Sequence, residues 1–68
     1  MNWRAKGSEV LRALARKGWS VKRQRGSHKT LNHPDFGDFV FSFGDHDEIG
    51  PVMLSRIGKR TGLTPNDL

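Results

Sequence analysis

Residues 26–28, Gly-Ser-His, place an imidazole directly after a glycine turn, in a stretch rich in lysine and arginine. Histidine is the side chain that both accepts and donates protons near neutral pH. Acid–base cleavage of RNA requires such a group, held among cations that attract phosphate. His28 is therefore the candidate catalytic residue. The alternative is a surface histidine beside a turn, with no chemical role.

The charge of the chain is distributed unevenly. Residues 1–33 hold nine Lys or Arg and one acid, a net charge of +8, whereas residues 34–68 hold three Lys or Arg and six acids, a net charge of −3. This division favours a basic surface that faces nucleic acid or an acidic protein. The alternative is that the basic half only solvates a helix and a hairpin.

The length of 68 residues predicts one small domain that covers residues 1–68. We expect residues 1–6 to be frayed, with Trp3 as a side chain that could dock on the core. No apolar run reaches the roughly 18 residues of a membrane span, and no signal peptide begins the chain. We therefore expect a cytoplasmic protein without a membrane partner.

The residues that commonly bind metal are few and scattered. The chain contains no cysteine, which excludes disulfides and thiolate zinc sites. His28, His33 and His46 lack the close spacing of a compact metal site. We therefore expect no metal ion and no other cofactor.

Hydrophobic periodicity and turn residues predict elements in the order αβββα. Ser8 is the expected N-cap of a first helix over residues 8–17, and Gly18 ends it. Three strands are expected at residues 19–24, 28–33 and 39–43. A second helix begins at Pro51 and ends at Gly62, and residues 64–67 form a final turn. The pattern predicts an α+β fold in which both helices cover one face of a three-stranded antiparallel sheet.

Strand alternation assigns side chains to the two faces of this sheet. We expect His33 to lie opposite Phe39, which places Leu31 and alternate phenylalanines on the core face. A three-residue turn at 25–27 then pairs Gln24 with His28. The polar face receives Lys22, Gln24, His28, Thr30, Asn32 and Ser42.

The same register assigns a sheet face to each of the remaining basic and histidine residues. Arg23 and Lys29 have core parity, so we expect them at the end of the sheet, reaching around it. His33 faces the side opposite to His28, which favours a structural role at the turn before Pro34 over catalysis. His46 has the parity of His28 and is a candidate second catalytic group, with a plain loop histidine as the alternative.

Taken together, these residues resemble the HicA toxins. The resemblance spans about residues 7–68 and consists of short motifs in a fixed order. These motifs are Lys17-Gly18-Trp19, Arg23-Gln24-Arg25, Gly26-Ser27-His28, His33-Pro34, Glu48-Ile49-Gly50-Pro51, Met53-Leu54, Ile57, Lys59 and Thr61-Gly62-Leu63. The resemblance implies a fold like that of double-stranded-RNA-binding domains and a toxin of a type II toxin–antitoxin system.

The resemblance also implies an activity and partners. HicA toxins cleave mRNA independently of the ribosome, and a HicB-type antitoxin covers their active site. The family's catalytic histidine corresponds to His28. Family members often have a histidine-rich sequence after the third strand, whereas this chain has only His46, among acids.

The hypothesis is thus a metal-independent endoribonuclease that binds RNA through residues around the Gly-Ser-His turn. The candidate RNA-binding residues are Lys22, Arg23, Gln24, Arg25, Gly26, Ser27, Lys29 and Thr30. Two alternatives stay open. One is a non-catalytic RNA-binding module of the same fold, and the other is a protein-interaction domain whose basic surface receives an acidic partner.

Overall fold

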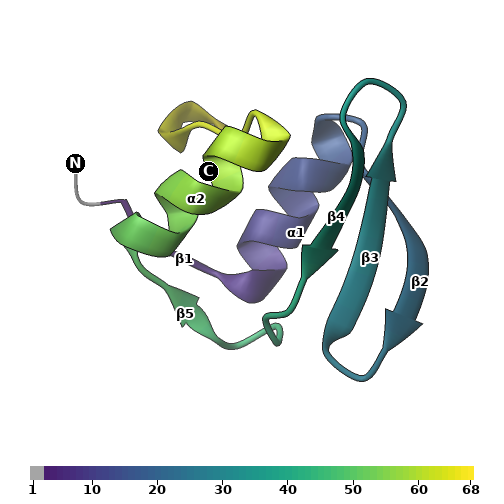
Figure 1. Cartoon of the computed structure of the whole chain (residues 1–68). Coiled ribbons are helices and arrows are strands. Elements are labelled where there is room, and N and C mark those ends of the chain that lie inside the picture. Colours follow the sequence, from purple (N-terminus) through teal and green to yellow (C-terminus); the bar gives the residue numbers. More distant parts are fainter. Residues whose placement is uncertain (1–2) are drawn as a thin grey trace.

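The computed structural model describes residues 3–68, in which two α-helices lie on one face of a three-stranded antiparallel sheet of order β2–β3–β4 (Figure 1). The elements are β1 (Ala5–Lys6), α1 (Gly7–Arg16), β2 (Ser20–Arg25), β3 (His28–His33), β4 (Gly37–Phe41), β5 (Glu48–Ile49), α2 (Pro51–Thr61) and the 3₁₀ turn η1 (Pro65–Asp67). This arrangement confirms the predicted fold class. Within residues 3–68, neither helix has the length and apolar character that crossing a membrane requires.

The segment before α1 is ordered by a short strand pair that the sequence pattern did not predict. In β1 and β5, Ala5 lies opposite Ile49 and Lys6 opposite Glu48. Ala5 and Ile49 are buried, and Trp3 packs against the core. Residues 3–6 are therefore held against the segment that leads into α2, whereas residues 1–2 lie outside the described part of the chain.

Helix α1 begins at Gly7, earlier than predicted, and its N-cap is Lys6 and not Ser8. The Glu9 carboxylate accepts a hydrogen bond from the Lys6 amide at 2.8 Å. The Gly7 amide donates to the carbonyl of Asp47 at 2.9 Å. Free amides at a helix start need acceptors, and here a distant loop supplies one. A side-chain cap from Ser8 is therefore not required.

The core lies between the helices and the sheet. Its buried apolar side chains are Ala5, Val10, Ala13, Leu14, Trp19, Leu31, Phe41, Ile49, Leu54, Ile57 and Leu63. Thr61 is the polar residue at its centre, and its hydroxyl donates to the Ile57 carbonyl at 2.7 Å. The Trp19 indole N–H donates to the Thr61 carbonyl at 3.3 Å. Both buried polar groups therefore have partners.

The β3–β4 register differs from the prediction by two residues. Leu31 lies opposite Phe39, and His33 lies opposite Gly37 instead of Phe39. The connection is shorter than expected because Gly37 adopts a positive φ of 81° and already belongs to β4. A shift of two residues preserves the alternation of faces. The predicted core face, with Leu31 and Phe41 buried, is therefore correct.

The β2–β3 register differs in a way that does change faces. The turn has two residues, Gly26 and Ser27, so that Arg25 and not Gln24 lies opposite His28. Gly26 has a φ of 60°, as the first position of a tight hairpin turn often requires. A β-bulge between Val21 and Arg23 absorbs the extra residue of β2.

The bulge places two arginines on the face of His28. Arg23 pairs with Thr30 and Arg25 with His28, whereas Gln24 pairs with Lys29. The prediction that Gln24 shares the face of His28, with Arg23 on the core side, is therefore wrong. Lys29 keeps the predicted core parity.

The burial of Leu54 in the core leads to a prediction about stability. We expect Leu54→Ala to lower the free energy of unfolding by about 2–5 kcal/mol, because Leu54 is fully buried. The matched control is Met53→Ala on the same helix, where the side chain is 37% exposed and the loss should stay below about 1 kcal/mol. Urea unfolding followed by circular dichroism measures both. Equal losses would contradict the assignment of Leu54 to the core.

Candidate functional site

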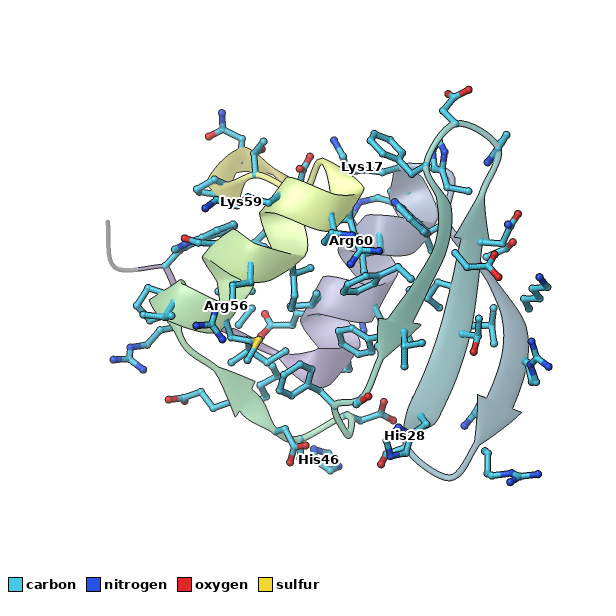
Figure 2. The ribbon with its side chains drawn as sticks, viewed as in Figure 1. Lys17, His28, His46, Arg56, Lys59 and Arg60 are labelled. Atoms are coloured by element: carbon cyan, nitrogen blue, oxygen red, sulfur yellow. The ribbon has the colours of Figure 1, made fainter. Side chains whose placement is uncertain are left out.

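His28 is the first residue of β3, and its side chain is exposed at the end of the sheet where β2 and β3 are joined (Figure 2). Its parity on β3 is opposite to that of the buried Leu31, so it lies on the sheet face that the helices leave uncovered. Its Nδ1 lies 3.1 Å from the hydroxyl oxygen of Ser42, which follows β4. A hydroxyl group both donates and accepts hydrogen bonds, so Ser42 can hold the ring in either tautomer. Because this bond engages Nδ1, Nε2 is the ring nitrogen left for a substrate.

Two arginines stand directly beside this imidazole. Arg25 lies opposite His28, and Arg23 lies opposite Thr30, the next residue of β3 on the same face. Directly opposed side chains of antiparallel strands have Cβ atoms about 4.5–5.5 Å apart. Together with Gln24, these residues line a hollow of about 410 Å³. Within the part of the chain that the structure describes, no acidic residue lines this hollow, so it is suited to an anion such as a phosphate.

The other predicted binding residues are placed less uniformly. Gly26 and Ser27 form the exposed turn between Arg25 and His28. Lys29 is half-buried and pairs with Phe41 in β4, so its side chain starts from the sheet face that the helices cover. The structure therefore brings the turn, but not Lys29, onto the face of His28.

Lys22 has an acidic partner farther along the same face. Its Nζ lies 3.0 Å from Oδ2 of Asp38. The Asn32 amide donates to the other oxygen of Asp38 at 2.8 Å. These hydrogen bonds, first from Asn32 and then from Lys22, hold the pKa of Asp38 below its usual value. The charge of Lys22 is therefore partly neutralised by this ion pair.

His33 has the structural role that the sequence favoured. The Asp35 amide donates to Nδ1 at 3.0 Å, and Nε2 lies 2.9 Å from the Lys17 carbonyl. Since Nδ1 accepts, Nε2 carries the proton and donates to Lys17. The ring also contacts Trp19, with the two centroids 5.1 Å apart. Both nitrogens of His33 are engaged, so it ties the end of α1 to β3 and the following turn.

His46 is exposed in the turn of residues 44–47. The Asp47 carboxylate accepts from the Gly44 amide at 2.8 Å, which closes this turn. Figure 2 shows His46 and His28 at the same end of the molecule, on different segments. No group of three or more His, Cys, Asp or Glu side chains that could hold a metal ion occurs within residues 3–68.

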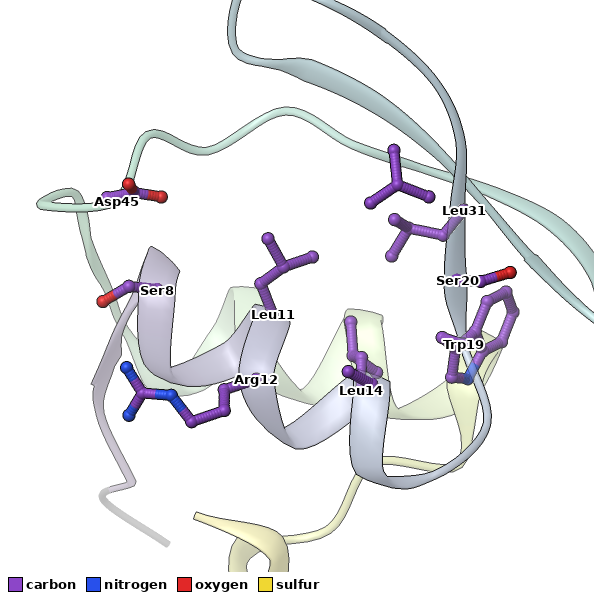
Figure 3. A pocket seen from close by; sticks show the side chains of 10 residues that line it. Ser8, Leu11, Arg12, Leu14, Trp19, Ser20, Leu31 and Asp45 are labelled. Atoms are coloured by element: carbon purple, nitrogen blue, oxygen red, sulfur yellow. The ribbon is translucent and has the colours of Figure 1, made fainter.

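Two further grooves flank the sheet. The groove between α1 and β2 is lined by apolar residues such as Leu11, Leu14 and Leu31, with Arg12 and Asp45 at its rim (Figure 3). None of the described residues that line it is a histidine. The second groove lies between α2 and β4.

The α2–β4 groove contains functional candidates that sequence reasoning missed. It is lined by Phe39, Val40, Ser42, Phe43, Met53, Arg56, Ile57 and Arg60. Sequence alternation placed Ser42 on the polar face but gave no reason to pair it with His28, because that pairing depends on the β3–β4 register. The spacing of Arg56 and Arg60, four residues apart on a helix, was the available signal for a basic face.

The carboxylate of Asp38 gives a prediction for this face. Because its pKa is lowered in the folded chain, Asp38 stabilises the fold above its unfolded pKa, and this contribution is lost as pH falls through the folded pKa. We expect Asn32→Ala to raise the pKa of Asp38 by removing its main hydrogen bond. Lys22→Met should raise it as well. Carboxyl carbon chemical shifts against pH measure the change, and an unchanged midpoint in both variants would contradict the contacts.

Comparison with known proteins identifies the family. A family model described as the HicA toxin of bacterial toxin–antitoxin systems matches residues 7–63, most of the chain. No curated protein and no solved structure matches the chain. The family match agrees with the resemblance of the motifs and implies an antitoxin as the partner. The chain therefore belongs to the HicA toxins of bacterial toxin–antitoxin systems.

Proposed function

We propose that this toxin is a metal-independent endoribonuclease that cleaves mRNA with His28 as its acid–base residue. The observation that supports this function is the placement of His28. One ring nitrogen is held by Ser42, and two arginines lie on the same open face. Such an arrangement joins a proton-transfer group to cations that attract a phosphodiester.

The proposed reaction is transfer of the phosphodiester within the RNA. The ribose 2′-oxygen attacks the adjacent phosphorus, the new O2′–P bond forms, and the P–O5′ bond breaks. A base accepts the 2′ proton, and an acid protonates the departing 5′ oxygen, which leaves a 2′,3′-cyclic phosphate. His28 Nε2 is suited to either transfer, because Ser42 can accept from Nδ1–H or donate to Nδ1.

The arginines and the hairpin turn stabilise the phosphate in this proposal. Arg23 and Arg25 offer guanidinium groups that can pair with phosphate oxygens through two N–H donors. The backbone amides of Gly26 and Ser27 belong to the turn beside His28. Donors aimed at the extra negative charge of the transition state lower its free energy. His46 is the candidate for the second proton transfer.

The first test removes the proposed acid–base group. We expect His28→Ala to lower the rate of RNA cleavage by about 10²–10⁴-fold and to abolish growth arrest when the toxin is induced. His28 is exposed, so the variant should unfold at the same temperature as the wild type. His46→Ala, measured in parallel, reports whether the second histidine takes part.

Cleavage of a structureless RNA by purified protein, followed on a gel, is the direct readout. If His28→Ala still arrests growth at equal expression, the mechanism is wrong. RNA binding without cleavage by the wild type, between about pH 5 and 8, where histidine titrates, would instead identify a non-catalytic RNA-binding module.

The second test concerns metal and salt. We expect EDTA to leave the cleavage rate unchanged, because proton transfer by histidine replaces metal activation. RNA affinity should fall as salt rises, and Arg25→Gln should reduce the slope of log K against log salt by about 1. Lys22→Gln should change this slope less, because Asp38 already pairs with Lys22. Loss of activity in EDTA that Mg²⁺ restores would overturn the metal-independent reaction.

A further inference from the structure

The groove between α2 and β4 has an apolar floor that is open to solvent. Its volume is about 380 Å³, and its lining includes Phe39, Phe43 and Ile57. Val40 is 56% exposed and Met53 is 37% exposed. Clustered exposed apolar side chains on a small protein mark an interaction surface.

The two edges of the sheet differ in how they are protected. β2 carries a bulge between Val21 and Arg23, and four of its six residues are Lys, Arg or Gln. Bulges and charged side chains prevent an edge strand from pairing with another chain. β4 pairs with β3 over five consecutive residues without a bulge, and its single charged residue is Asp38. The β4 edge is therefore the one suited to pair with a further strand.

Cations stand on the helix side of this groove. Arg56 and Arg60 line it from α2, one helical turn apart (Figure 2). None of the ion pairs within residues 3–68 involves either residue. The Arg60 guanidinium lies 5.7 Å from the centre of the Phe39 ring, which holds it over the groove. None of the described residues that line the groove is acidic, so the complementary ligand is acidic.

We propose that this groove docks an extended, acidic segment of the antitoxin, which adds as a strand along the outer edge of β4. A polypeptide can pair its backbone with the edge strand while alternate side chains enter the apolar floor. Its acidic residues meet Arg56 and Arg60. A nucleic-acid strand fits less well, because it has no peptide backbone to continue the sheet.

The groove is continuous with the site of His28. Ser42 lines the groove, and its hydroxyl oxygen is 3.1 Å from Nδ1 of His28. A segment that extends the sheet beside β4 therefore ends next to the imidazole and blocks the approach of a larger ligand. This inference depends on the family assignment and not on RNA cleavage, so either proposal can fail without the other.

The experiment measures the affinity of the full-length toxin for the purified antitoxin encoded with it, by isothermal titration calorimetry. We expect Val40→Glu to weaken binding by at least about tenfold, because it replaces an exposed apolar side chain of the β4 edge with a negative charge, next to the acidic segment that is proposed to pair there. Val21→Glu is the matched control, since Val21 is a 48% exposed valine on the other edge strand. It should change the affinity less than about threefold.

A second pair of variants tests the charge complementarity. Arg56→Glu combined with Arg60→Glu should weaken antitoxin binding by about 100-fold or more. Arg12→Glu combined with Arg16→Glu, on α1, makes the same change in net charge and should have a much smaller effect. Thermal unfolding of each variant confirms that it folds. Amide hydrogen exchange should slow in residues 38–43 when the antitoxin binds.

Three outcomes would overturn the proposal. The first is that the groove variants and their controls lower the affinity for the antitoxin equally. The second is unchanged exchange in residues 38–43. The third is that the groove variants bind a short, 2′-O-methylated single-stranded RNA more weakly while their affinity for the antitoxin is unchanged, which would assign the groove to RNA.

Discussion

The bulge in β2 is the constraint on which the candidate site depends. Side chains alternate between the two faces of a strand, so one inserted residue reverses the face of every residue beyond it. Without the bulge, Trp19 could stay in the core only if Arg23 turned toward the helices, where burying a guanidinium is unfavourable. With the bulge, Trp19 is buried while Arg23 and Arg25 emerge beside His28. The same irregularity therefore serves folding and builds the cationic site.

Two histidines at the ends of β3 have opposite roles because of their parity. His33 is nearly buried, and both of its nitrogens are engaged by backbone groups. Gly18 is needed beside it, because a Cβ there would come within 3.0 Å of Nε2, and its φ is 101°. His28, five residues earlier, faces the open side and is held by one side-chain hydroxyl. An odd separation along one strand thus yields one structural and one accessible imidazole.

Local signals predicted much of the fold, and the errors come from contacts between distant segments. Pro51 and Gly62 fix both ends of α2 through backbone geometry alone, as predicted. The start of α1 was predicted too late because the carbonyls of Asp47 and Asp45 accept from the amides of Gly7 and Ser8, so the helix begins at Gly7 without a side-chain cap from Ser8. The bulge has no sequence signature in β2, so the predicted partners of Arg23 and Gln24 are each displaced by one residue along β3. The contact between Ser42 and His28 likewise required the true register of β3 and β4.

The open β4 edge poses a physical problem that the proposed docking would resolve. An unprotected edge strand invites pairing with other chains, and a small fold with a single hydrophobic core has little stability to spare against such association. A lysine or a bulge would protect the edge, as in β2, but would also abolish the apolar floor next to Ser42. The absence of such protection on β4 is explained if a dedicated partner binds along this edge. Ser42 lies both beside the β4 edge and in contact with the imidazole. Binding of a partner along this edge and access of a substrate to His28 would therefore be coupled through one hydroxyl group.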